Sequence, residues 1–180
     1  TLVDDDALAE PVPEDERVVM PMFIAMDRPK HTEERRVIAP AFTPGEMVRM
    51  TEDIRVRTGD LLDSLPVGQT FDWVDKVSIE LTTQMLALIF DFPWEDRRLL
   101  TEWSDWAGDV ELFRTSENRK LRLAKMYEMG AYFQRLWEAR KVKGEAPDLI
   151  SRMIHSPMKH MSPFEYMGNL VLLIVGGNDT

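Results

Sequence analysis

Apolar residues recur at the spacing of a helical face along most of the chain, and no stretch shows the period-two alternation of a strand. Residues 1–22 are mostly acidic, contain three prolines and are predicted to be irregular, with room for one short helix. The predicted helices cover residues 29–39, about 43–65, 72–91, 94–108, 117–143, 148–155, and 163 onward. Such a succession of helices with short links predicts an all-α fold.

The last predicted helix begins with a capping box, with Ser162 as the N-cap, Pro163 as the first helical residue and Glu165 as the third. An unbroken apolar run follows from Leu170 to Val175. A helix that is apolar on all sides is typical of the centre of a domain. We therefore expect the other helices to pack around this one.

Two glycines, Gly176 and Gly177, follow the apolar run, and each costs a helix about 1 kcal/mol relative to alanine. One interpretation is a C-cap, because Gly-Gly-Asn-Asp forms a favourable turn. The other is close approach, in which a flat ligand or a diatomic molecule lies against backbone that has no side chains. Asp179 and Thr180 come next and offer an acid and a hydroxyl for proton transfer. Local signals leave both interpretations open.

Composition and charge exclude several classes of partner. The chain has 180 residues, enough for one domain with a sizeable core, and a net charge of −10. Its first 27 residues hold eight acidic residues and one basic residue, which argues against nucleic-acid binding. The apolar runs are too short to span a membrane, and no signal peptide opens the chain. We expect a soluble cytoplasmic protein.

Metal and thiol chemistry find little support within these residues. The sequence has no cysteine, which excludes disulfides, zinc-thiolate sites and cysteine nucleophiles. His155 and His160 are separated by a proline, and their spacing does not place them on one helix face. We interpret both as solvated loop histidines and predict no protein-borne metal ligand.

A second chemical motif lies in the first predicted helix. His31 and Arg35 are four residues apart, so they share a helix face. A guanidinium offers a planar fork for a carboxylate, and a histidine ring nitrogen can donate a hydrogen bond. The alternative is an ordinary exposed pair on a helix surface.

Both motifs resemble the cytochrome P-450 superfamily of haem-thiolate monooxygenases. Residues 176–180, G-G-N-D-T, match the family's [A/G]-G-x-[D/E]-T motif on its long distal helix. Residues 27–44 resemble D-P-P-x-H-x-x-x-R followed by F-[S/T]-P, with Arg28 in place of the first proline. The resemblance covers nearly the whole chain from about Val18.

The resemblance implies a fold and a domain organisation. Residues 1–180 would form a single incomplete domain, the distal half of the cytochrome P-450 fold, ending within the long central distal helix. Family chains are more than twice this length, and their haem-ligand cysteine lies near the C-terminus. The expected chain is therefore a fragment that lacks the cysteine loop, with residues 94–108 and 117–143 as the two lid helices over the pocket.

It also implies roles for individual residues around haem b. His31 and Arg35 would bind the haem propionates, and Gly176 and Gly177 would lie against the cofactor. The catalytic pair would be Asp179 and Thr180, which deliver protons to bound oxygen. Apolar substrate would contact Leu172 and Val175, together with an apolar patch at residues 18–24.

The implied reaction is monooxygenation, in which one atom of O2 enters a C–H bond and the other leaves as water. The segments F-I-A-M-D, L-I-F-D-F-P-W and L-I-V-G-G-N-D-T are similar to the bacterial alkane and fatty-acid terminal hydroxylases. A basic cluster of Arg28, Lys30, Arg35 and Arg36 would face a ferredoxin-type electron donor. Two alternatives are a non-enzymatic all-α binding module and a peroxygenase on the same fold, although a peroxygenase has no need of Asp179 and Thr180.

Overall fold

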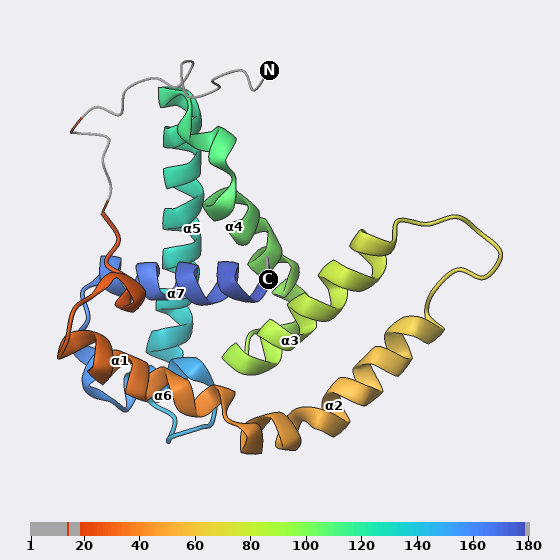
Figure 1. The fold of residues 1–180 in the computed structure, drawn as a ribbon, viewed down its shortest axis with the longest axis horizontal. Coiled ribbons are helices and arrows are strands. Elements are labelled where there is room, and N and C mark those ends of the chain that lie inside the picture. Colours follow the sequence, from red (N-terminus) through yellow and green to blue (C-terminus); the bar gives the residue numbers. More distant parts are fainter. Residues whose placement is uncertain (1–13, 15–18, 179–180) are drawn as a thin grey trace.

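The fold is entirely helical in the part of the chain that is described, which confirms the all-α prediction. A computed structural model describes Glu14 and residues 19–178, and within these residues it contains no strand (Figure 1). No helix in this part has the length and apolar content needed to cross a bilayer. The α helices are α1 (Lys30–Ile38), α2 (Pro44–Asp63), α3 (Glu80–Phe90), α4 (Arg98–Gly108), α5 (Ser116–Lys141), α6 (Leu149–Ile154) and α7 (Pro163–Asn178).

Most helix starts coincide with the predicted caps. The Thr43 hydroxyl accepts a hydrogen bond from the Glu46 N–H (3.4 Å) at the start of α2. The Ser162 hydroxyl accepts one from the Glu165 N–H (3.2 Å) and so begins α7. These side chains satisfy N–H groups that have no partner inside the helix.

Two predicted helices begin differently from the expectation. The segment predicted as one helix over residues 94–108 is divided into a 3₁₀ turn, Trp94–Asp96, and α4. Here the Trp94 carbonyl accepts from both the N–H and the guanidinium of Arg97, which holds the tighter turn. The segment that Asp72 caps opens with a π-helical turn, Val74–Ile79, before α3. Helical periodicity cannot separate α, 3₁₀ and π turns over so few residues.

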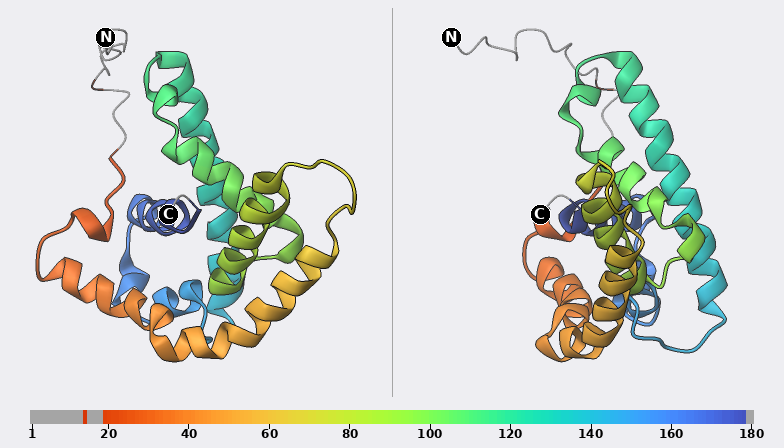
Figure 2. Two further views of the ribbon diagram at one scale, coloured as in Figure 1. Left: turned by 45° about the vertical axis from the view of Figure 1, so that its right-hand side comes forward. Right: turned by 90° about the vertical axis from the view of Figure 1, so that its right-hand side faces the viewer.

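The helices form two antiparallel pairs and a crossing helix. Helices α4 and α5 lie side by side, and α2 and α3 form a second pair joined by a long loop (Figures 1 and 2). Helix α7 contacts α3, α4 and α5, so it holds the central position that its apolar run predicts. The fully buried apolar side chains come from α3 to α7: Phe90, Leu100, Trp103, Met126, Met129, Phe133, Leu149, Ile150, Met153, Leu170 and Ile174.

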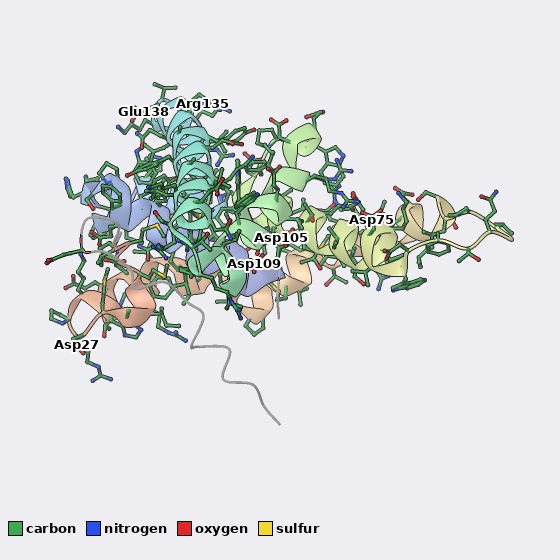
Figure 3. All side chains as sticks on the ribbon, turned by 90° about the horizontal axis from the view of Figure 1, so that it is seen from above. Asp27, Asp75, Asp105, Asp109, Arg135 and Glu138 are labelled. Carbon is green, nitrogen blue, oxygen red and sulfur yellow. The ribbon has the colours of Figure 1, made fainter. Side chains whose placement is uncertain are left out.

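Charged residues surround this core. Asp27, Asp105, Asp109, Arg135 and Glu138, which are labelled in Figure 3, are all exposed. Between α3 and α7, apolar side chains of both helices line the cavity that forms the candidate site.

Arg140 is an exception, because its guanidinium is buried and joins three elements. It donates to the Phe90 carbonyl (2.9 Å) and contacts both the carbonyl and the carboxylate of Asp91, which ends α3 in a left-handed conformation. It also pairs with the Asp148 carboxylate (3.3 Å), the N-cap of α6. One side chain of α5 thereby fixes the ends of α3 and α6.

Candidate functional site

A cavity with a mostly apolar lining lies between α3 and α7. It has a volume of about 550 Å³, and its lining includes a single polar side chain, Thr82. An apolar ligand is favoured there because apolar area removed from water is stabilising. The lining residues are Phe42, Leu81, Thr82, Met85, Leu86, Ile89, Phe90, Leu149, Leu172, Leu173, Gly176 and Gly177.

The apolar run of α7 has two different faces. Leu170 and Ile174 are fully buried in the core, whereas Leu172, Leu173 and Val175 are half-buried. The expectation that this run is buried on all sides is therefore correct for one face only. Leu172 and Leu173 line the cavity, while Val175 packs against the core and does not contribute to the cavity wall.

The two glycines lie inside α7, which continues to Asn178, so the C-cap interpretation is wrong. They differ in their surroundings. A Cβ added to Gly177 would lie 2.6 Å from Leu86 Cδ2, so this glycine lets α7 approach α3 closely. A Cβ added to Gly176 would meet no heavy atom within 4 Å. Gly176 therefore leaves open space along the cavity, while Gly177 serves helix packing. Asp179 and Thr180 lie outside the described residues.

His31 and Arg35 lie one helical turn apart on α1, as predicted. Arg35 is exposed and forms no salt bridge within the described residues. The His31 ring is half-buried and stacks against Phe23, with ring centroids 6.4 Å apart. Helix α1 continues through the 3₁₀ turn Ala39–Phe42 to Phe42, which lines the cavity. The segment that begins with His31 and Arg35 thus reaches, at Phe42, the cavity that Gly176 and Gly177 also line.

The apolar patch at residues 18–24 was expected to contact substrate, but its described part does not line the cavity. Val18 lies outside the described residues, and none of residues 19–24 lines the cavity. Phe23 is buried, but Val19 and Ile24 are exposed. The chain at Pro21 instead crosses α7 beside Gly168, where an added Cβ would lie 2.3 Å from the Pro21 carbonyl oxygen.

The basic residues before and on α1 differ in whether they contact the protein or face solvent. Lys30 Nζ lies 2.6 Å from a carboxylate oxygen of Glu165 on α7, so this lysine is directed toward the protein. Arg28, Arg35 and Arg36 remain exposed.

Sequence reasoning missed one residue of α7 that connects this helix with α1 and with the segment before α1. Asn169 is fully buried on α7, donates to Glu34 of α1 (3.0 Å) and accepts from the Phe23 N–H (2.8 Å). The available signal was an amide immediately before an unbroken apolar run, since a buried amide requires hydrogen-bond partners.

Known proteins with similar sequence or structure come from the same family that the two sequence motifs indicate. No family model matches the chain. The structure of cytochrome P450-153 from Novosphingobium aromaticivorans superposes with a TM-score of 0.82 at 60% identity, covering 99% of this chain and 41% of that one. CYP153D17 from Sphingomonas sp. PAMC 26605 gives a TM-score of 0.82 at 64% identity, covering 94% and 42%. Linalool 8-monooxygenase from Pseudomonas putida is 30% identical over 162 residues, or 88% of this chain and 39% of that protein.

The chain therefore spans about two fifths of the length of the relatives that it matches. The match is to one part of the same helical fold, and it includes α1 with His31 and Arg35 as well as α7 with its two glycines. The chain belongs to the cytochrome P450 superfamily.

Proposed function

We propose that this chain forms the distal, substrate-side part of a haem-dependent monooxygenase that inserts one atom of O2 into a C–H bond of an alkane or fatty acid. The observation that carries the proposal is the apolar cavity along the glycine face of α7. The relatives support the reaction class, since the Pseudomonas relative is named for monooxygenation of linalool. The resemblance to alkane and fatty-acid hydroxylases supports the substrate class.

The residues present fit haem b, a flat apolar ring with two carboxylates. The cavity wall is apolar, and the space beside Gly176 lets a flat ring approach the helix backbone. Arg35 has a guanidinium free for a carboxylate, and His31 has a ring held by stacking on Phe23. The iron thiolate is not among these 180 residues, because the sequence has no cysteine.

When bound, haem supplies the oxidising chemistry with O2, and the chain's own residues bind, orient and deliver protons. Leu172, which lines the cavity, would hold the apolar substrate and keep water away from it, while Val175 supports this wall from the core side. The Thr180 hydroxyl would supply a hydrogen-bond donor and a position for a water molecule beside the bound cofactor. The Asp179 carboxyl carries protons from solvent to that hydroxyl.

The proposed substrate class predicts that affinity for alkanes depends on their chain length. Each methylene that an apolar chain buries contributes about 0.8 kcal/mol, so longer alkanes should bind more tightly until the cavity is filled. Leu172→Ala should weaken this binding, because the leucine side chain lines the wall. Titration of the haem spectrum with alkanes of increasing length measures the effect, and equal affinity for short and long chains would exclude an apolar-chain site.

We also propose a ferredoxin-type electron donor. Arg28, Arg35 and Arg36 are exposed near one another in sequence on a chain of net charge −10. A local basic region on an acidic protein steers an acidic partner to that region. Rates of reduction by an acidic ferredoxin should therefore fall with ionic strength, and salt-independent rates would exclude this docking.

The experiment that tests the cofactor assignment compares two neighbouring arginines in the haem-loaded protein that carries this chain. Arg35→Ala should release haem about ten- to a hundredfold faster, since a hydrogen bond to a charged group contributes about 1.5–3 kcal/mol. Arg36→Ala removes the same charge one residue away and should leave haem loss unchanged. His31→Ala should have a smaller effect than Arg35→Ala. If Arg35→Ala and His31→Ala both retain haem as firmly as the parent, the assignment is wrong.

A further inference from the structure

A buried polar cluster joins α1 to the beginning of α7. Glu34 of α1 and Glu165 of α7 are 5% and 8% exposed, and Asn169, one turn further along α7, is 0% exposed. Asn169 Nδ2 donates to Glu34 Oε2 (3.0 Å), while Lys30 Nζ lies 2.6 Å from Glu165 Oε1 and 3.8 Å from Glu34 Oε1. Two carboxyls this buried are unfavourable unless they are paired and hydrogen-bonded.

Two almost fully buried carboxyls beside one lysine are expected to share one proton. Burial raises the pKa of Glu34, and its hydrogen bond with Glu165 raises that pKa further. Burial acts on Glu165 in the same direction, but the hydrogen bonds from Lys30 and Glu34 outweigh it and lower the pKa of Glu165. Between these two pKa values Glu34 is neutral and donates to an ionised Glu165, which is the usual solution for two adjacent carboxyls.

The cluster reaches His31 through Asn169. The Asn169 Oδ1 accepts the backbone N–H of Phe23 (2.8 Å), and the Phe23 ring stacks on the His31 ring. One amide therefore holds both α1, through Glu34, and the segment that supports the His31 ring. Both contacts form only with the amide oxygen toward Phe23 and the amino group toward Glu34, which fixes the orientation of the amide.

We propose that Asn169 and the Glu34–Glu165 pair are positioning residues that form a one-proton latch, which sets α1, and with it His31 and Arg35, against α7. This inference rests on the proposed role of His31 and Arg35 in holding haem carboxylates. The latch itself is a property of the chain without the cofactor, so the two can be tested separately.

Other charged groups face the latch and must be considered with it. Lys30 and Glu33 approach from α1, His160 from the 3₁₀ turn Pro157–His160, and the Ser162 N–H from the start of α7. Lys30, Glu33 and His160 border a cavity of about 330 Å³ that Glu34 and Glu165 also line.

The shifted pKa values of Glu34 and Glu165 affect the stability of the fold at opposite ends of the pH range. The raised pKa of Glu34 contributes stability that is fully present below its unfolded value and is lost as pH rises through the folded value. The lowered pKa of Glu165 contributes stability that is present above its unfolded value and is lost as pH falls through the folded value. The latch is therefore closed at pH values between the folded-state pKa values of Glu165 and Glu34. Above the pKa of Glu34 it opens, because both carboxyls are then ionised and repel each other.

The first test looks for the shared proton directly by infrared spectroscopy. A neutral carboxylic acid has a carbonyl stretching band that a carboxylate lacks. The haem-loaded protein should keep such a band above the pH at which exposed glutamates ionise, Glu34→Gln should abolish it, and the exposed Glu33→Gln should leave it in place. A band that is absent from the parent, or that survives Glu34→Gln, overturns the shared proton.

The second test measures positioning through haem loss to excess apomyoglobin as pH is raised. The parent should lose haem faster as Glu34 ionises, whereas Glu34→Gln, which stays neutral, should show a flat profile. His160→Gln should keep the parent profile, which separates the imidazole from the carboxyls. Asn169→Leu should lose haem about tenfold faster at neutral pH, because a hydrogen bond to the carboxyl is gone.

The outcomes separate the latch from the proposed function. An infrared band with a parent profile that is already flat would show a structural proton that does not act on α1, and would overturn the positioning role. If Arg35→Ala and His31→Ala leave haem loss unchanged, the proposed function fails, while the infrared result still decides the latch.

Discussion

Substitution of Gly168 by alanine tests the packing of α7 most directly. An added Cβ would lie 2.3 Å from the Pro21 carbonyl oxygen, 3.1 Å from the Pro21 carbonyl carbon and 3.2 Å from the Met20 carbonyl carbon. All three atoms belong to backbone, so no side-chain rotation relieves the contact. Alanine favours a helix by about 1 kcal/mol over glycine, whereas overpacking costs about 1–3 kcal/mol. The contact with backbone lies at the upper end of that range, and we expect a net loss of about 1–2 kcal/mol.

The assay is denaturant unfolding of the haem-loaded protein, with Gly59→Ala as the matched control. Gly59 lies inside α2, where an added Cβ meets no heavy atom within 4 Å, so this variant should gain about 1 kcal/mol. Hydrogen exchange should also become faster at residues 19–25 in Gly168→Ala alone, because the crossing segment must move away. If Gly168→Ala is as stable as Gly59→Ala, the close crossing of the chain over α7 is wrong.

Four further substitutions probe the rest of the structure. Arg140→Ala should destabilise by about 3–5 kcal/mol in thermal unfolding, because it leaves buried Asp148 without its partner; a loss under 1 kcal/mol would contradict the clamp. Gly176→Ala should weaken haem binding without lowering apoprotein stability, since its Cβ enters open space; unchanged haem affinity would argue against a ring at this position. Thr180→Ala should keep haem and substrate binding but release peroxide in place of product per reductant consumed, and unchanged coupling would exclude the hydroxyl. Asp179→Asn should slow turnover with less peroxide, as measured in the same assay.

Local sequence signals predicted the helices because the forces behind them are local. Thr43 and Ser162 cap their helices as expected, since each hydroxyl reaches an N–H only three residues away. The apolar run before Gly176 likewise predicted the central helix, because its burial follows from composition alone. These inferences needed no knowledge of which helices touch.

The parts that sequence reasoning did not reach depend on contacts between distant residues. Asn169 and Glu34 are 135 positions apart, and Arg140 binds the Phe90 carbonyl across 50 positions. A single sequence gives no signal for such pairs, because many acids and amides have the same local surroundings. The different roles of Gly176 and Gly177 could not be predicted from the sequence either, because only the position of Leu86 on α3 distinguishes the two glycines.

A single hydrogen bond at the end of α7 has a mechanical consequence. Asn178 Nδ2 donates to the Leu100 carbonyl of α4 (3.1 Å), and α4 is in turn held to α5 by the ion pair of Glu102 with Lys125 (2.7 Å). A sliding motion of α4 along its neighbours must therefore either break the Asn178 bond or pull the last described turn of α7 with it. One such bond contributes about 1 kcal/mol, so thermal motion breaks it often and re-forms it as often. The contact therefore favours one position of the α4–α5 hairpin against the central helix, and it yields readily if the hairpin is displaced.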